Sequence, residues 1–300
     1  MIKALIASAL IATTLASTAQ AKIKVVASFS ILGDLVANVG GGLVEVSTIV
    51  GPDSDAHAYE PKPQDVKALA DASLVVVNGL GFEGWQQRLI DASGYTGNVV
   101  TATDGITPLP TDNHDHGQEE SKNETSDPHA WQDIRHSMAY VSTIAIGLCE
   151  VDASGCQTYK ANAVAYNVKL ESLSAEIKRA FDAIPGDQRI VITSHDAFSY
   201  LGKAFDIAFL APEGINPDAD ASAGDVATLI RQIRQTKAKA LFVENISDPR
   251  LLQQIAQETG LTVGGTLYSD ALSGPNGPAA TYIAMMRHNS KMLAGAILSN

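Results

Sequence analysis

Short apolar segments alternate with helical patterns in both halves of the chain, and this alternation constrains the fold more than any other feature. The apolar segments are rich in Val and Ile and are bounded by turn residues, as buried strands are. They lie at residues 24–28, 44–50, 74–77 and 98–103, and again at 189–193, 207–210, 240–243 and 261–267. Strands that alternate with helices predict an α/β fold with mainly parallel sheets flanked by helices.

The helical patterns between these strands repeat apolar residues every three to four positions. They cover residues 32–39, 63–72, 84–92, 198–204, 224–238, 249–259 and 279–298. Another helix is expected to begin at Asp127-Pro128 and to run through Trp131 to Leu148.

One longer amphipathic stretch, residues 157–184, lies between the two halves and ends at Pro185-Gly186. A helix of about 28 residues spans roughly 40 Å, which is enough to run along two domains. We therefore predict an N-terminal α/β lobe (22–156), a rigid linking helix (157–185) and a C-terminal α/β lobe (186–300).

Residues 111–126 interrupt the pattern of the N-terminal lobe. The segment contains no Val, Ile, Leu or aromatic residue and is dense in Asp, Glu, Asn and His. This composition predicts a mobile acidic loop.

The first 21 residues are expected to form a cleavable signal peptide. Lys3 supplies a positive charge, residues 4–15 form a short apolar run, and Ala19-Gln20-Ala21 fits a cleavage site. The run is short for a membrane span, and the junction has no Cys to carry a lipid. We expect a soluble periplasmic protein.

The chain is acidic, with 33 Asp and Glu against 21 Lys and Arg, a net charge of −12. Such a charge repels nucleic acid and anionic lipid and mildly favours cations. No nucleic-acid partner is expected.

Cys149 and Cys156 are the two cysteines of the sequence, separated by six residues. In an oxidising compartment a disulfide is the default expectation. A metal site built on the two thiolates is the weaker alternative, because no other Cys or His lies nearby to complete it.

His57, His129 and His195 each lie where a predicted strand or loop gives way to the next element, and Asp270 follows the last predicted strand. Open α/β sheets bind ligands at the carboxyl ends of their strands. Three imidazoles and one carboxylate form the ligand set of a closed, tetrahedral zinc site. Spacing alone leaves a metal site and ordinary structural histidines about equally favoured.

Two further histidines, His136 and His288, lie on predicted helices and are expected to be solvated. Ser194, His195 and Asp196 are adjacent in sequence, which is incompatible with the geometry of a hydrolytic triad. No catalytic residue is expected.

Four motifs occur in order along the chain and carry a family resemblance. They are Asp55-x-His57-x-Tyr59-Glu60-Pro61, Asp127-Pro128-His129-Ala130-Trp131, Ser194-His195-Asp196-Ala197-Phe198-Ser199-Tyr200 and Tyr268-Ser269-Asp270. Together they resemble the zinc- and manganese-binding solute-binding proteins of ABC importers (cluster A-I), and within that family the AztC-type periplasmic zinc-binding proteins. The resemblance covers the whole mature chain.

The resemblance implies two α/β lobes joined by one long helix, with His57, His129, His195 and Asp270 as ligands of one Zn²⁺ per chain. It also implies a monomer that is not an enzyme and delivers zinc to an inner-membrane permease. A periplasmic zinc metallochaperone is a further candidate partner.

The chain departs from the family pattern at two places. The loop at 111–126 carries only His114 and His116, which are candidate auxiliary metal ligands, whereas many zinc-binding members have a long histidine-rich loop. Ala56 stands before the first ligand, where the family often has Pro or His. Two other functions stay open: a zinc-dependent hydrolase, and a periplasmic zinc buffer or adhesin with no role in transport.

Overall fold

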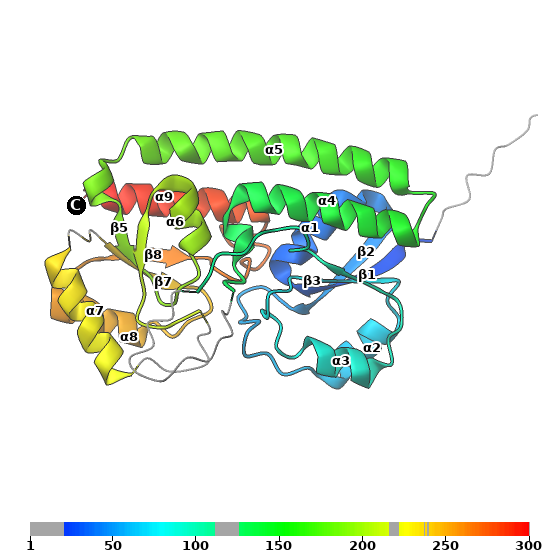
Figure 1. Ribbon diagram of the computed structural model, residues 1–300, viewed down its shortest axis with the longest axis horizontal. Coiled ribbons are helices and arrows are strands. Elements are labelled where there is room, and N and C mark those ends of the chain that lie inside the picture. Colours follow the sequence, from blue (N-terminus) through cyan, green and yellow to red (C-terminus); the bar gives the residue numbers. More distant parts are fainter. Residues whose placement is uncertain (1–20, 112–125, 216–221, 237, 239, 300) are drawn as a thin grey trace, which may run out of the picture.

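The computed structural model describes residues 21–111, 126–215, 222–236, 238 and 240–299. Residues 1–20 of the expected signal peptide and residues 112–125 of the loop, with His114 and His116, lie outside the described residues. Figure 1 shows two α/β lobes side by side beneath one long helix. Within the described residues no helix is long and apolar enough to cross a membrane.

The N-terminal lobe is built on a parallel sheet in the order β2-β1-β3-β4. Its strands are β1 (Ile23–Phe29), β2 (Val44–Val50), β3 (Leu74–Val77) and β4 (Asn98–Thr101). The two central strands are almost entirely buried, and β3 reads Leu-Val-Val-Val, as expected for a strand covered on both faces.

The C-terminal lobe repeats this arrangement with a parallel sheet in the order β6-β5-β7-β8. Its strands are β5 (Ile190–Ile192), β6 (Ala208–Leu210), β7 (Ala240–Glu244) and β8 (Val263–Leu267). All eight strands lie within the segments that the apolar pattern predicts, except that β1 is longer by one residue at each end and β7 by one residue at its carboxyl end. The two-lobed α/β prediction is confirmed.

Helices flank both sheets (Figure 1). They are α1 (Ser30–Gly40), α2 (Pro63–Ala70), α3 (Gln86–Ser93), α4 (Ile134–Val151), α5 (Cys156–Asp182), α6 (Ser199–Phe205), α7 (Ala223–Gln235), α8 (Arg250–Thr259) and α9 (Tyr282–Ser299). Short 3₁₀ turns lie at Gly41–Leu43, Ala130–Gln132 and Gly186–Gln188.

The expectation that one helix begins at Asp127 is wrong. The segment forms a 3₁₀ turn at Ala130–Gln132, breaks at Asp133, and becomes α-helical only at Ile134. Asp133 has extended backbone angles and its side chain accepts a hydrogen bond from the backbone N–H of Arg135, which is how an N-cap starts a helix. Residues 127–129 are therefore irregular, and His129 lies just ahead of the 3₁₀ turn.

α5 forms the spine of the molecule. Its buried side chains recur at helical spacing and pack against α1, α4 and α9, which belong to both halves of the chain. They are Tyr159, Ala163, Tyr166, Leu170, Leu173, Ile177 and Phe181. Buried apolar residues of both lobes, such as Val25 and Phe242, belong to one continuous core. The lobe boundaries at 156 and 185 stay a prediction.

The turn between α4 and α5 is closed by a disulfide between Cys149 and Cys156, whose Cα atoms are 4.5 Å apart. Both sulfurs are used in the bond, so the alternative of a thiolate metal site is wrong.

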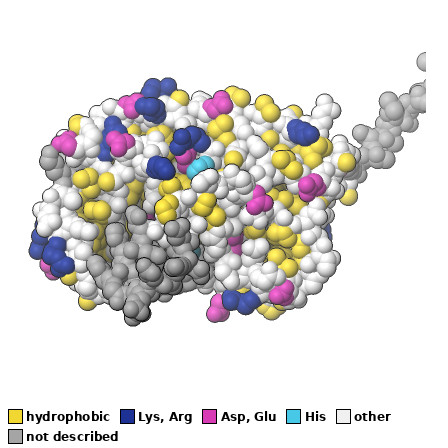
Figure 2. All heavy atoms as spheres, viewed as in Figure 1, with side chains coloured by type: hydrophobic (Ala, Val, Ile, Leu, Met, Phe, Trp, Pro, Cys, Tyr) yellow, Lys and Arg dark blue, Asp and Glu magenta, His cyan; other side chains and the backbone are white. Residues whose placement is uncertain are grey.

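Charged side chains of both signs are interspersed over the described part of the face in Figure 2. Several form ion pairs along the surface. Lys178 pairs with Asp182 at 2.7 Å on α5, and Arg287 of α9 pairs with Glu176 of α5 at 2.8 Å. The second of these pairs links the C-terminal helix to the spine.

Candidate metal site

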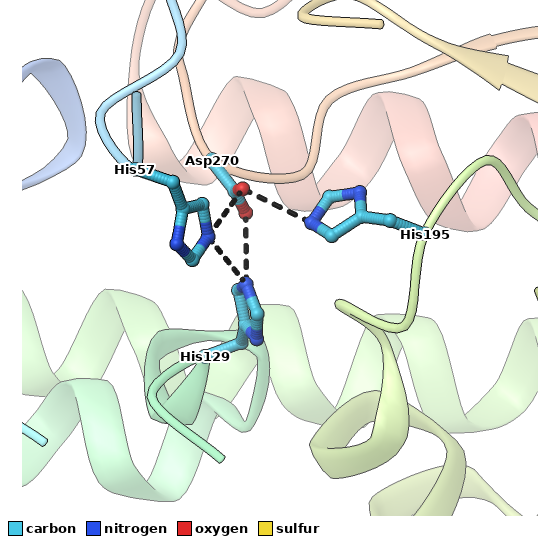
Figure 3. A group of neighbouring side chains, drawn as sticks. All are labelled: His57, His129, His195 and Asp270. Carbon is cyan, nitrogen blue, oxygen red and sulfur yellow. Dashed lines mark hydrogen bonds and ion pairs between the residues drawn. The ribbon is translucent and has the colours of Figure 1, made fainter. Parts of the chain in front are cut away.

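The structure brings His57, His129, His195 and Asp270 together between the lobes (Figure 3). Three of them follow the carboxyl ends of strands: His57 lies in the loop after β2, His195 after β5 and Asp270 after β8. His129 comes from the irregular segment ahead of α4. Parallel strands end at the same edge of a sheet, and the two sheets present these edges to each other.

The potential ligand atoms of the four residues all lie within 4.8 Å of one another. His57 Nε2 is 3.3 Å from His129 Nε2 and 3.4 Å from Asp270 Oδ2. Asp270 Oδ2 is also 3.1 Å from His195 Nε2, and Oδ1 is 3.6 Å from His129 Nε2. Metal–nitrogen bonds of about 2.0–2.1 Å in a tetrahedron place ligand atoms about 3.3 Å apart. The cluster therefore has the size of a small metal ion's coordination shell.

The site is closed to solvent. The side chains of His129, His195 and Asp270 are fully buried, and that of His57 is 4% exposed. Among the described residues neither carboxylate oxygen of Asp270 accepts a well-directed hydrogen bond. A buried carboxylate without a well-directed hydrogen bond is costly, and a cation at the centre of the cluster would compensate for it.

A second carboxylate lies behind each of the two fully buried histidines. Asp127 Oδ1 is 2.8 Å from His129 Nδ1, and Glu244 Oε2 is 2.7 Å from His195 Nδ1. An Nδ1–H that faces a carboxylate leaves the Nε2 lone pair free to point into the cluster. These outer carboxylates therefore select the tautomer that can bind metal.

Backbone contacts hold the loops that carry the histidines. Asp55 accepts a hydrogen bond from the N–H of His57 at 2.8 Å, and Asp127 accepts one from the N–H of His129 at 2.9 Å. Both aspartates stand two residues before their histidine. Glu244 Oε1 accepts from the N–H groups of Ser194 and His195 at 2.8 and 3.0 Å. His129 and His195 are thus held through both the ring and the backbone, and His57 is held through its backbone.

Aromatic rings line the cluster beside His57 and His129. Phe82 lies edge-on to His57 with ring centroids 4.6 Å apart, and Trp131 lies 5.3 Å from His129. Trp131 Nε1 also donates to the carbonyl of Ser269 at 2.9 Å, and Trp85 Nε1 donates to that of Ala56 at 2.8 Å. The aromatic residues exclude water and hold the chain on either side of the site.

The electrostatic coupling within the cluster is strong. Burial raises the pKa of Asp270, but the His129 and His195 rings hold that pKa well below its usual value. Burial lowers the pKa of His195, but Glu244 and Asp270 raise it well above 6.5. Burial also lowers the pKa of His129, but Asp270 and Asp127 outweigh this effect and raise that pKa to about 9. Without a metal, protons on the imidazoles balance the buried carboxylates, so a cation has to displace them.

The expectation that His136 and His288 are solvated is wrong, because both are half-buried. The His136 ring packs edge-on against Tyr200 with centroids 5.3 Å apart. His288 Nε2 is 3.0 Å from the carbonyl oxygen of Thr266, and its ring packs on Tyr268. Both have packing roles outside the metal cluster.

The roles of the outer carboxylates Glu244 and Asp127 are not predicted from the sequence. Glu244 ends the apolar strand β7, and a charged residue at the carboxyl end of a buried strand is the signal that could have revealed it. Asp127 belongs to a motif that attracts attention through its histidine.

Comparison with known proteins identifies the family of the chain. Residues 25–296 match the model of the periplasmic zinc-uptake complex component A, ZnuA. The chain belongs to this family. It is therefore related to the metal-binding components of ABC importers, which are substrate-binding proteins and not enzymes, and which act outside the cytoplasm with a membrane permease and an ATPase.

Individual relatives are named for different metals. The manganese-binding lipoprotein MntA of Halalkalibacterium halodurans is 34% identical over 89% of this chain and 86% of its own length. The iron-binding protein YfeA of Yersinia pestis is 34% identical over 94% of this chain and 88% of its own. The structure of the periplasmic zinc-binding protein TroA from Treponema pallidum superposes with a TM-score of 0.83, at 26% identity, over 92% of this chain and 100% of that chain. The family is thus clear, whereas the metal must be argued from the site.

Proposed function

We propose that this protein binds one Zn²⁺ per chain through His57, His129, His195 and Asp270 and delivers it to the permease of an ABC importer. The ligand set is the observation that carries the proposal: three imidazole nitrogens and one carboxylate oxygen converge within 4.8 Å. Borderline nitrogen ligands suit Zn²⁺, whereas Mn²⁺ favours oxygen-rich shells with more ligands.

Manganese is the competing cargo, since MntA is named for that metal. The position of His195 supports zinc, because a carboxylate there would make the shell half oxygen. Glu244 adds to this support. Its Oε2 lies 2.7 Å from His195 Nδ1, and this contact turns Nε2 of the ring toward the centre of the cluster. Orientation of a ligating imidazole by an outer carboxylate is common at zinc sites.

The proposal has four finer parts, which rest on sequence motifs and on the family resemblance. They are cleavage of the signal peptide after Ala21, membership of the AztC-type group, loading by a periplasmic metallochaperone, and an auxiliary role for His114 and His116. The mature protein would act as a monomer.

A competition titration tests the choice of metal. The mature protein, stripped of metal, is titrated with Zn²⁺ and with Mn²⁺ against a chelator of known affinity for each. We expect one zinc per chain, bound more tightly than manganese. In the matched variant His195→Asp, the preference should shift toward manganese because an oxygen replaces a nitrogen. Tighter binding of Mn²⁺ by the wild type would overturn the zinc assignment.

A further inference from the structure

The loop that carries His57 is tied to the C-terminal lobe by Asp53. The backbone N–H of Asp53 donates to the carbonyl of Leu272 at 2.9 Å. Its two carboxylate oxygens accept from Asn245 Nδ2 and from the backbone N–H of Gly274, each at 3.0 Å. All three partners belong to the other lobe. One residue of the N-terminal lobe therefore makes three hydrogen bonds across the interface.

These hydrogen bonds lie close to the metal cluster in sequence and in space. Asp53 precedes His57 by four residues, and Leu272 follows Asp270 by two. Figure 3 shows the His57 and Asp270 loops facing each other at the site. Asn245 directly follows Glu244, which contacts His195 at 2.7 Å. The interlobe contact of Asp53 thus joins the segments that hold three of the four proposed ligands.

The partner side of the contact is itself held in place. The backbone N–H of Asn245 donates to the carbonyl of Leu267 at 3.0 Å, at the end of the β7–β8 pair. Its side-chain amide also lies 3.3 Å from the carbonyl of Ala271. Asn245 therefore presents its amide to Asp53 from the frame of the C-terminal sheet.

The backbone of Asp53 is in the left-handed region, with φ of 51°. Non-glycine residues adopt this conformation at a cost, and Asp and Asn tolerate it best. Strained residues persist where the surrounding contacts hold them, often at ligand clamps. Here the three interlobe hydrogen bonds offset the cost.

We propose that Asp53 is a positioning residue that latches the His57 loop onto the C-terminal lobe and slows release of the bound metal. Metal can leave a closed cluster only when a ligand moves away. His57 is carried by a loop of the N-terminal lobe, whereas His195 and Asp270 belong to the opposite lobe. Separating them requires the bonds of Asp53 to Asn245, Leu272 and Gly274 to break as well. The latch rests on the proposed role of His57 as a ligand.

The amide and the carboxylate of the latch can be exchanged between positions 53 and 245. Asp53→Asn keeps the shape of the side chain and its tolerance for positive φ. It places an amide N–H₂ opposite the N–H₂ of Asn245, so that two donors face each other. Asn245→Asp sets two carboxylates against each other. The double variant Asp53→Asn/Asn245→Asp again pairs one amide with one carboxylate, in reversed roles. Asn245→Ala removes the contact without adding charge.

The experiment measures metal release from the full mature protein. Zinc-loaded and manganese-loaded proteins are mixed with an excess of a chromogenic chelator, and the dissociation rate is followed by stopped flow. We expect Asp53→Asn, Asn245→Asp and Asn245→Ala each to release metal about tenfold faster, the effect of losing one hydrogen bond to a charged group. The exchanged double variant should recover most of the wild-type rate. Asp71→Asn, an exposed charge change in the same lobe, is the matched control and should release metal like the wild type.

Release from Asp53→Asn at the wild-type rate would overturn the latch. So would an exchanged double variant that releases metal as fast as Asn245→Asp, because the two side chains would then act independently. If the zinc proposal fails, the wild-type protein will instead bind manganese more tightly than zinc. The release rates of the manganese-loaded variants then test the latch. A wild type that binds neither metal would overturn both.

Discussion

At the scale of single residues, the His195 ring lies between two carboxylates with different roles. Glu244 approaches Nδ1 at 2.7 Å and Asp270 approaches Nε2 at 3.1 Å. The first carboxylate orients the ring and selects its tautomer, and the second is proposed to bind the same metal ion as the ring. Substitutions of the two should therefore weaken zinc binding in distinguishable ways.

Glu244→Gln should lower zinc affinity by roughly 10–100-fold while all four proposed ligands remain. An amide N–H₂ that faces Nδ1 makes that nitrogen an acceptor, which puts the ring proton on Nε2 where the metal should bind. Competition with a chelator measures the loss. Glu83→Gln is the matched control: Glu83 is also buried, but its carboxylate accepts hydrogen bonds from the Ser28 hydroxyl and from the backbone N–H groups of Asn78 and Gly79. Equal losses in both variants would assign Glu244 a structural role only.

Asp270→Ala should keep about one zinc per chain at reduced affinity. Three imidazoles and a water form the shell of many zinc sites, so a water can occupy the vacated position. The affinity should fall by at least the roughly 100-fold that the loss of an outer partner can cost. His195→Ala should weaken binding more. Metal content after dialysis, followed by calorimetric titration, ranks the two. The assignment of roles fails if Asp270→Ala loses all zinc while His195→Ala retains it.

At the scale of elements, regular structure is predictable from the sequence where burial has a simple period. The strand at Leu74–Val77 is a continuous apolar run bounded by Asn78-Gly79, so its ends are marked in the sequence. The start of α4 cannot be located from the sequence, because two start signals compete. Asp127-Pro128 looks like a cap, but the Asp127 side chain contacts His129, and Asp133 caps the helix instead.

The four residues of the candidate site can be chosen from the sequence, but the contacts that hold them together cannot. Each histidine has a local signal in its motif. The contact of Glu244 with His195 and that of Asp53 with Asn245 join residues 49 and 192 positions apart. The first pair depends on the pairing of β5 with β7 within one sheet, and the second depends on how the two sheets face each other. Local periodicity carries no information about either arrangement.

Removing the disulfide should destabilise the protein without affecting the metal site. Closing the short loop between α4 and α5 contributes about 2–3 kcal/mol in the chain-entropy model. Cys149 and Cys156 lie at the end of α4 opposite to His129, so we expect unchanged zinc affinity. Denaturant unfolding of the Cys149→Ser/Cys156→Ser variant, next to the reduced wild type, measures the free energy of unfolding. A loss of zinc affinity would show that the turn and the site are coupled.

At the scale of the whole molecule, two lobes are joined by the long helix α5 and by a hydrophobic core that extends into both, and the candidate metal cluster lies between them. Side chains from the loops of both lobes and from the segment before α4 converge there. A metal bound at this position adds contacts that the unfolded chain lacks, and so it stabilises the entire fold. The strength of this effect should depend on pH, because protons compete for the same nitrogens.

We predict that zinc stabilises the protein more at pH 9.5 than at pH 6.5. Asp270 and Asp127 outweigh burial and raise the pKa of His129 to about 9 in the metal-free protein. Because the folded pKa exceeds the unfolded value of about 6.5, this contribution to stability is complete below pH 6.5 and is lost as pH rises through 9. Zinc binding requires the deprotonated nitrogen, so its affinity rises over the same range, by about 1.4 kcal/mol per pH unit for one proton.

Calorimetric melting of metal-free and singly loaded protein at both pH values measures this difference. The metal-free melting temperature should fall between pH 6.5 and 9.5, while the shift produced by zinc should grow. Asp127→Asn is the informative variant, because it removes one of the two carboxylates that raise the His129 pKa. In this variant the zinc-induced shift of the melting temperature should reach its full size at a lower pH than in the wild type. An equal zinc-induced shift at pH 6.5 and 9.5 in the wild type would mean that no imidazole proton is displaced when the metal binds.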